Sequence, residues 1–210
     1  MTEYRTIAGR TRSEYIVKKS RFITTLQPVD SLEEGLKIVA EVRKEFSDAT
    51  HNCYAIVGLP ESNEQKCSDD GEPGGTAGQP MFQVLRKNGL FGVVAVVTRY
   101  FGGIKLGAGG LVSAYAKAVT EGLMQAESVT MRDSVVLEAE LGYDAYQNLM
   151  RYVSANKLKV LDTRYGDSVA LTLAVPVEHR LRTEGAIAEL TAGEACIRFL
   201  KQTYIQYREV

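Results

Sequence analysis

Residues 93–116 read VVAVVTRYFGGIKLGAGGLVSAYA and predict a strand, a glycine-rich turn and a helix in direct succession. The apolar run at residues 93–97 is typical of a strand that is covered on both faces. Five glycines follow between positions 102 and 110, and so dense a cluster indicates positive φ angles or a close approach of two backbones. The segment therefore predicts a sheet with cover on both sides and a tight turn at the end of one buried strand.

The same turn predicts a site for an anion such as phosphate. A glycine-rich turn that opens a helix exposes unpaired N–H groups, and Arg99 and Lys105 add positive charge beside them. A P-loop is excluded because Ala108 and Gly109 stand where lysine and serine or threonine are required. A dinucleotide-binding fingerprint is excluded because Val112 stands at its third glycine. Packing of the helix onto the sheet is an equal alternative reason for the glycines. The predicted binding residues of this segment are Arg99, Tyr100, Gly102, Gly103, Lys105, Gly107, Gly109 and Gly110.

Composition limits the classes of partner. The chain has 210 residues, 45% of them hydrophobic, and a net charge of −1, which is expected for a globular protein with a real core and no bulk affinity for nucleic acid. Three widely spaced cysteines without a C-x-x-C pair argue against a disulfide framework and a zinc site. The polar N-terminus lacks a secretory signal, and no apolar run approaches the ~20 residues that span a membrane. We therefore expect a cytoplasmic protein with no metal, no cofactor and no membrane partner.

The pattern of apolar and polar residues changes near residue 132. We therefore expect two domains, over residues 1–131 and 132–210. Within the second, alternating apolar residues and two amphipathic segments predict the order β-α-β-β-α-β, which is the ferredoxin-like arrangement. Its first helix is expected to begin with a capping box of Asp144 and Gln147, and its second helix is expected to bury Leu181 and Ile187. The predicted fold class is α+β.

In the first domain, residues 14–27 predict a strand pair or one long bent strand. Ser31 with Glu34 forms a capping box at the start of a helix, and residues 51–58 predict the next strand. Residues 60–80 are rich in Pro, Gly, Ser, Asn and Asp and predict a long loop. Such loops in compact domains are often functional.

Polar residues in and before this loop are the candidate catalytic groups. Asp69, Asp70 and Glu72 place three carboxylates within four residues, and such a group can hold a cation or act as acid and base. For a metal, a solvated Asp-Gly turn is the simpler interpretation. His51 and Cys53 would share one face of a strand and could form a base and a nucleophile, but a buried cysteine beside a hydrogen-bonded histidine is commoner. The common hydrolase motifs G-x-S-x-G and H-E-x-x-H are missing.

Four segments carry a family signature: KKSRF at residues 18–22, ATHNCYA at 49–55, SDDGEPGGTAGQPM at 68–81 and VVTRYFGGIKLGAGGLVSAYA at 96–116. Together they resemble the IMPACT family, specifically its bacterial YigZ-like branch, with Gly75 standing where many relatives carry serine. The resemblance implies an N-terminal βαβ domain with the left-handed crossover of a ribosomal-protein domain and of domain IV of elongation factor G. It also implies that the C-terminal ferredoxin-like half is similar to domain V of that factor.

The resemblance and the anion-suited turn together predict a non-enzymatic regulator or binding protein of the translation apparatus. We expect contact with RNA, the ribosome or a translation factor through the glycine-rich turn and the basic strip at residues 18–21, where Lys19 and Arg21 are the predicted contacts. Two alternatives stay open. One is a small hydrolase that uses His51 and the carboxylates of residues 69–72. The other is a protein–protein adaptor that docks through the ferredoxin-like half.

Overall fold

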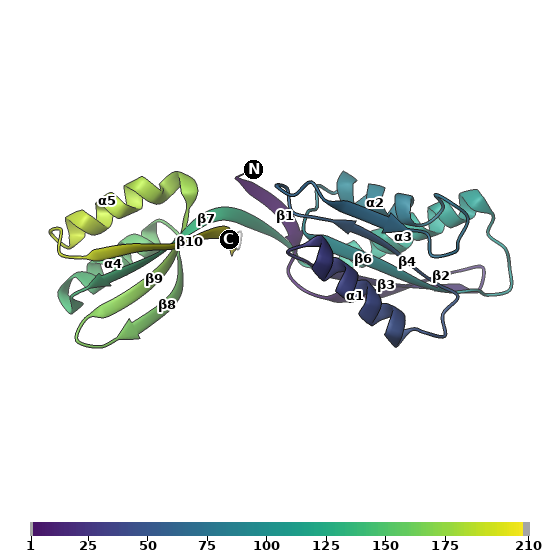
Figure 1. Cartoon of the computed structure of the whole chain (residues 1–210), viewed down its shortest axis with the longest axis horizontal. Helices are drawn as coiled ribbons and strands as arrows, with labels where there is room; N and C mark the ends of the chain where they lie inside the picture. Colours follow the sequence, from purple (N-terminus) through teal and green to yellow (C-terminus); the bar gives the residue numbers. More distant parts are fainter. Residues whose placement is uncertain (1, 208–210) are drawn as a thin grey trace. The chain divides into compact units, whose positions relative to one another are not determined.

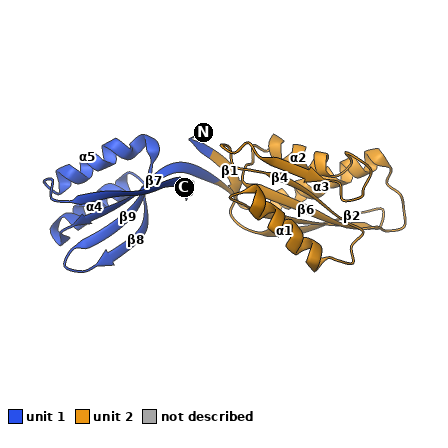
Figure 2. Cartoon of the chain, viewed as in Figure 1, with its two compact units in different colours: residues 1–3, 130–210 blue, residues 4–129 orange. Residues whose placement is uncertain are grey.

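The structure of the chain, a computed structural model, describes residues 2–207 (Figure 1). Figure 2 shows its two compact units. The N-terminal unit is Tyr4–Val129, and the C-terminal unit comprises residues 130–207 together with residues 2 and 3. The described residues form two antiparallel sheets of five strands each and five α-helices. The predicted α+β class is therefore confirmed.

The N-terminal unit is a sheet with helices on both faces (Figure 1). Its elements after the first strand β1 (Glu3–Ile7) are β2 (Thr11–Val17), β3 (Ser20–Pro28), α1 (Leu32–Glu45), β4 (His51–Val57), β5 (Gln65–Ser68), α2 (Gly78–Lys87), β6 (Val93–Tyr100) and α3 (Ala108–Gln125). The strand order is β2-β3-β6-β4-β5, and each neighbouring pair is antiparallel. β3 and β4 both pair with β6, so they run parallel to each other and are joined through α1.

The apolar strand β6 lies in the middle of this sheet. Val94 and Val96 pack against the core under α1, while Val93, Ala95 and Val97 pack against the core under α2 and α3. All five side chains are fully buried, so the predicted cover on both faces is confirmed. Uninterrupted apolar strands of this kind are typical of parallel sheets. Here the sheet is antiparallel, and the strand is apolar throughout because helices cover both of its faces.

The alternative at residues 14–27 resolves into a hairpin of β2 and β3, with Val17 opposite Ser20. The two turn residues, Lys18 and Lys19, have φ angles of 45° and 64°. Both therefore adopt the left-handed backbone that two-residue hairpin turns require and that Asn and Gly usually supply. For a lysine this conformation costs about 1 kcal/mol, so the turn carries two ammonium groups on a strained backbone.

The capping box predicted at the start of α1 is confirmed, and the long loop predicted over residues 60–80 is partly wrong. The Glu34 N–H donates to Ser31 Oγ at 3.1 Å, and Glu34 Oε2 accepts from the Asp30 N–H at 2.7 Å. Within the predicted loop, Gln65–Ser68 forms the edge strand β5, and α2 begins at Gly78. The free edge of β4 offers backbone hydrogen bonds to this segment, and that pairing overrides its turn-forming composition.

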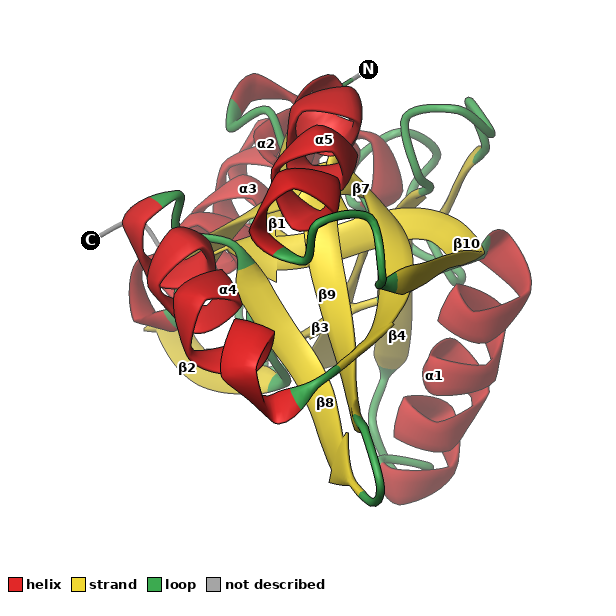
Figure 3. Ribbon diagram, turned by 90° about the vertical axis from the view of Figure 1, so that its left-hand side faces the viewer, coloured by secondary structure: helices red, strands yellow, loops and turns green. Residues whose placement is uncertain are grey.

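The C-terminal unit has the predicted order of strands and helices. Its elements are β7 (Ser128–Leu141), α4 (Tyr143–Ala155), β8 (Lys159–Tyr165), β9 (Val169–Pro176), the short 3₁₀ helix Val177–His179, α5 (Arg180–Leu190) and β10 (Cys196–Tyr207). The sheet order is β1-β7-β9-β8, and β10 also pairs with β7. Figure 3 shows α4 and α5 on the same side of this sheet, where Leu149, Val153 and Ile187 join one apolar core with the strands.

Two predictions for these helices are wrong. The residue before α4 is Gly142, which makes no side-chain capping bond, and Asp144 lies within the first turn instead of at the cap. Leu181 is 82% exposed. The predicted burial of Ile187 is confirmed, but α5 buries Thr183 with it in place of Leu181. Thr183 and Ile187 are four residues apart and so share a face, whereas Leu181 lies off that face.

Candidate functional site

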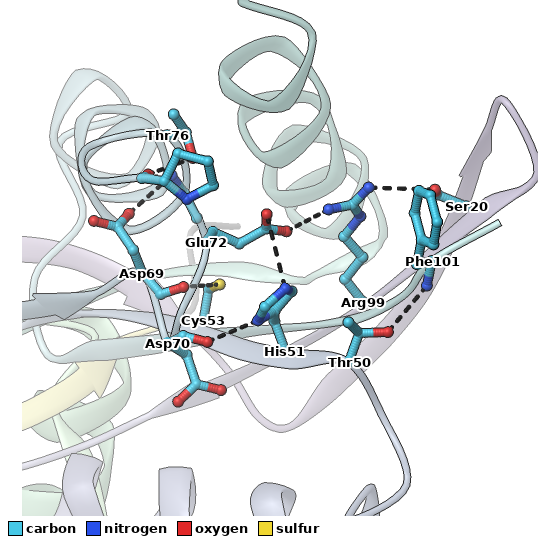
Figure 4. A network of polar contacts seen from close by, with 12 residues as sticks. Ser20, Thr50, His51, Cys53, Asp69, Asp70, Glu72, Thr76, Arg99 and Phe101 are labelled. Carbon is cyan, nitrogen blue, oxygen red and sulfur yellow. Dashed lines mark hydrogen bonds and ion pairs between the residues drawn. The ribbon is translucent and has the colours of Figure 1, made fainter. Parts of the chain in front are cut away.

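The four signature segments meet at one end of the N-terminal sheet, around the carboxylate of Glu72 (Figure 4). Glu72 comes from the loop before α2, and its side chain is almost completely buried. Its Oε1 accepts a hydrogen bond from Arg99 Nη1 on β6 at 2.6 Å and another from the Tyr115 hydroxyl on α3 at 2.7 Å. Charge-assisted bonds of this kind are strong in a buried setting. Glu72 therefore joins the loop, the central strand and the helix.

Arg99 is an internal residue of this network. Its side chain is only 6% exposed, and its guanidinium lies 5.5 Å from the ring centroid of Phe22 and 5.6 Å from that of Phe101. Nη2 also reaches Ser20 Oγ at 3.5 Å, while Nε has no hydrogen-bond partner among the described residues. The positive charge predicted to face an anion is thus compensated inside the protein by Glu72.

His51 and Cys53 lie on β4 beside Glu72. The Nδ1–H of His51 donates to the Asp70 carbonyl oxygen at 2.8 Å, which leaves Nε2 facing Glu72 Oε2 at 3.9 Å. Cys53 Sγ contacts the Asp69 carbonyl oxygen at 2.9 Å and the Tyr115 hydroxyl at 3.3 Å. Burial, with smaller contributions from nearby carboxylates, raises the pKa of the Cys53 thiol to about 12. The thiol is therefore protonated at neutral pH and is a poor nucleophile.

The two aspartates of the loop each bind backbone groups. Asp69 Oδ1 accepts from the N–H groups of Ala77 and Gly78, at 2.9 and 2.8 Å, and its Oδ2 accepts from that of Gly75 at 2.8 Å. Burial alone would raise the pKa of Asp69, but these three N–H donors outweigh it and lower that pKa below its ordinary value. Asp70 accepts from the Asn52 N–H at 2.7 Å and pairs with Arg43. The predicted catalytic carboxylates are therefore held by separate partners.

Above this network, the glycine-rich turn and the β2–β3 turn touch. A Cβ on Gly102 would lie 2.0 Å from the backbone carbonyl carbon of Lys19, so only glycine fits. The Gly102 N–H donates to Ser20 Oγ at 3.2 Å, and the Phe101 N–H donates to Thr50 Oγ1 at 3.1 Å. At Gly102 the predicted close approach of two backbones explains the glycine, whereas Gly103 and Gly107 have the predicted positive φ angles, +83° and +75°.

The contact creates one exposed surface from two distant parts of the sequence, and we call it the basic loop surface. It consists of Lys18, Lys19, Phe101, Gly103, Ile104 and Lys105. Phe101 and Ile104 are 47% and 43% exposed. Among the described residues, none of the three lysine side chains forms an ion pair. Phe101 and Ile104 were missed by the sequence analysis, although an aromatic side chain directly before a Gly-Gly turn is a usable signal.

The remaining predicted binding residues have partners or lie at the start of α3. Arg21 pairs with Glu14 at 2.8 Å and lies over the Tyr100 ring, whose hydroxyl donates to Asp48 at 2.8 Å. α3 begins after Gly107 with no side-chain capping bond and no acidic residue in its first turn. No acidic side chain or side-chain cap therefore opposes an anion at this helix start, where Gly109 and Gly110 lie.

The protein is therefore a two-unit α+β protein whose N-terminal unit carries a buried polar network beneath a glycine-rich turn. The chain belongs to the IMPACT family: the family model described as the Impact N-terminal domain matches residues 18–123, and a domain of unknown function, DUF1949, matches residues 140–194. The resemblance inferred from the four segments is thereby confirmed.

Relatives and a solved structure extend the match over nearly the whole chain. The "IMPACT family member YvyE" of Bacillus subtilis (strain 168) is 36% identical over 97% of this chain and 94% of its own. The "IMPACT family member YigZ" of Escherichia coli (strain K12) is 38% identical over 84% of this chain and 88% of its own. A crystal structure described as that of a hypothetical protein has 33% identity and a TM-score of 0.65, covering 96% of this chain and 98% of that one.

Metal-binding clusters and long apolar helices are both missing from the described residues. Within residues 2–207, no group of three or more His, Cys, Asp or Glu side chains is placed to hold a metal ion. Among the helices of the same residues, none combines the length and the apolar character needed to cross a membrane.

Proposed function

We propose that this protein is a non-enzymatic binding protein of the translation apparatus that contacts RNA through the basic loop surface. The observation that carries the proposal is the backbone contact between Gly102 and Lys19, because it joins the two predicted binding segments into one surface. The link to translation comes from the resemblance to the IMPACT family. Within that family frame, we also propose that residues 1–131 and 132–210 are separate domains, related to domains IV and V of elongation factor G.

The chemistry of the basic loop surface suits single-stranded RNA. Lys18, Lys19 and Lys105 supply charge for phosphates. Phe101 supplies an exposed ring on which a base can stack, as single-strand binders commonly do. The three cations belong to exposed turns, and Arg99 supports Phe101 from beneath. In this proposal Arg99 positions the surface, and the lysines bind the phosphates.

The hydrolase alternative has less support from the geometry. Asp69 and Asp70 are engaged with backbone N–H groups and Arg43, Glu72 compensates Arg99, and the Cys53 thiol is protonated. His51 Nε2 lies 3.9 Å from Glu72, beyond hydrogen-bond distance. Each group thus holds its own part of the fold, which is the role expected of a structural polar network.

The test is binding to a fluorescent single-stranded RNA and co-sedimentation with ribosomes, both over a range of salt concentrations. In the variant Lys18→Gln/Lys19→Gln/Lys105→Gln, the slope of log K against log salt should become shallower by about 2, because each lysine that neutralises a phosphate of single-stranded RNA contributes ~0.7 to that slope. The matched control Lys37→Gln/Lys44→Gln/Lys66→Gln removes the same charge from α1 and β5 of the same unit. The proposal is overturned if wild-type protein binds neither target at low salt, or if both triple variants lose the same affinity.

A further inference from the structure

A cleft in the C-terminal unit gathers positive charge from distant parts of that unit. Its volume is about 1140 Å³, slightly above the ~300–1,000 Å³ that is usual for small-molecule sites. It lies between β7, the α4–β8 connection, the 3₁₀ helix before α5 and the end of β10. Its basic lining residues are Arg132, Lys157, Lys159 and His179. The described residues that line the cleft include no carboxylate.

The basic side chains of the cleft differ in their hydrogen-bond and ion-pair partners. Arg132 Nε donates to Glu3 Oε2 at 3.2 Å, and its guanidinium lies 5.6 Å from the ring centroid of Tyr207. Lys159 Nζ donates to the carbonyl oxygen of Gln206 at 3.3 Å. Lys157 forms no ion pair among the described residues. Neither Lys157 nor Lys159 forms an ion pair with a carboxylate of the described chain. Glu3 compensates Arg132, and Glu178 lies close to Tyr207, whose hydroxyl pKa is raised by burial and to a smaller extent by that carboxylate, so the uncompensated positive charge of the cleft comes from the two lysines.

The backbone at Lys157 is strained. Its φ angle is +52°, and it directly follows Asn156, the C-cap of α4. This left-handed position is the one at which helices usually carry glycine. The Lys157 N–H donates to Ser154 O and the Leu158 N–H to Val153 O, at 3.1 and 3.0 Å. These bonds occupy two of the free carbonyls at the end of α4. The negative end of the helix still disfavours an anion, so the cations of the cleft have to outweigh it.

The geometry points to a binding site for a nucleotide phosphate in this cleft. Lys157 and Lys159 would hold the phosphate oxygens together with Arg132, whose guanidinium is suited to such oxygens. The side-chain amides of Asn156 and Gln206 lie in the same cleft and can hydrogen-bond a base or sugar. A free nucleotide and the 5′-phosphate end of an RNA share this chemistry. The site is separate from the basic loop surface and does not rest on the proposed function.

Titration calorimetry of the full-length protein tests this site with ATP as the probe, alongside a short RNA with a 5′-phosphate and the same RNA with a 5′-hydroxyl. Lys157→Gln/Lys159→Gln should weaken ATP binding at least about tenfold, since charge-assisted hydrogen bonds are among the stronger ones. Lys157→Gly should also weaken binding, yet raise the unfolding temperature because glycine relieves the strained backbone. Arg182→Gln/Lys201→Gln, on α5 and β10, removes two exposed charges outside the cleft lining; it is the matched control and should bind as wild type.

ATP binding that depends on Lys157 and Lys159 supports the site, with a free nucleotide as the ligand. If ATP does not bind but the 5′-phosphorylated RNA does, in the same lysine-dependent way, the site is supported with an RNA end as the ligand. The RNA arms are measured in the Lys18→Gln/Lys19→Gln/Lys105→Gln background, which removes the contribution of the basic loop surface. The proposal is overturned if neither probe binds, if in that background the 5′-hydroxyl RNA binds as well as the 5′-phosphorylated RNA while ATP does not bind, or if Arg182→Gln/Lys201→Gln weakens binding to the same extent.

Discussion

Glu72 holds three elements together with one carboxylate. Its partner Arg99 is 27 positions away and Tyr115 is 43 positions away, so no local pattern in the sequence could have identified this cluster. Motif reasoning selected Glu72 and Arg99 separately, one as a candidate acid and one as an anion contact. It could not foresee that the two charges compensate each other in the interior, because burial depends on segments that meet only in the folded chain.

Replacing Glu72 should therefore be costly. In Glu72→Gln the Arg99 charge stays buried without its counter-ion, and loss of one partner of a buried pair typically costs ~3–5 kcal/mol of unfolding free energy. Urea unfolding measures the loss. The exposed carboxylate Glu41, which lies 3.9 Å from Arg10, provides the control Glu41→Gln, for which we expect less than ~0.5 kcal/mol. Equal stabilities of the two variants would contradict the role given to Glu72.

Asp69 should give the protein an acid-sensitive loop. Its folded pKa lies below its ordinary value of 3.8, so the ionised carboxylate stabilises the folded state above that value and loses this effect as the pH falls through the folded pKa. We expect Asp69→Ala to be less stable than wild type by ~1–2 kcal/mol at pH 7. The difference should shrink below pH ~4. A difference that is constant from pH 7 to pH 3 would show that Asp69 does not act through its charge.

Among the secondary-structure elements, those with strong local signals were predictable. Cover on both faces of β6, the capping box of α1 and the β-α-β-β-α-β order followed from apolar periodicity and capping residues. β5 was missed because its four residues become a strand only by pairing with β4. On α5 the burial of Ile187 was predicted correctly, but Leu181 was assigned to the same face because it fits a helical pattern in the sequence, while the residue buried beside Ile187 is Thr183.

A substitution at Gly102 tests whether the glycine-rich turn and the β2–β3 turn depend on each other. Gly102→Ala places a Cβ 2.0 Å from the Lys19 carbonyl carbon, and backbone on both sides has to move. We expect a loss of ~3 kcal/mol or more in unfolding free energy, at the upper end of the range for overpacking. Gly109→Ala is the control, because its Cβ meets no atom within 4 Å and alanine favours the helix. If the two variants unfold at the same urea concentration, the turns do not depend on each other.

For the molecule as a whole, the pairing of strands was beyond prediction. β3 and β4 both border β6, although whole helices and loops separate them from it in the sequence. Such long-range pairing leaves no trace in local periodicity, which specifies only the face on which a side chain lies. The two apolar cores of the N-terminal unit, one on each face of its sheet, are both formed from residues 4–129.

A chain limited to Tyr4–Val129 should therefore fold alone. We expect one cooperative thermal transition, with the circular dichroism and intrinsic tyrosine fluorescence of this fragment changing together. The fragment should also retain the RNA salt dependence proposed for the basic loop surface. Non-coincident transitions or a fragment without cooperative unfolding would show that the N-terminal unit needs the rest of the chain.

The hairpin turn of Lys18 and Lys19 has a consequence for anyone who engineers this protein. Both positions have the geometry that Asn-Gly fills most easily, so a screen for heat resistance would favour that replacement and gain about 1–2 kcal/mol. The same replacement removes two of the three ammonium groups of the basic loop surface. The sequence with lysine at both positions is therefore less stable than the Asn-Gly variant but carries two more positive charges. The difference in RNA affinity between the two proteins would show how much affinity these two charges contribute.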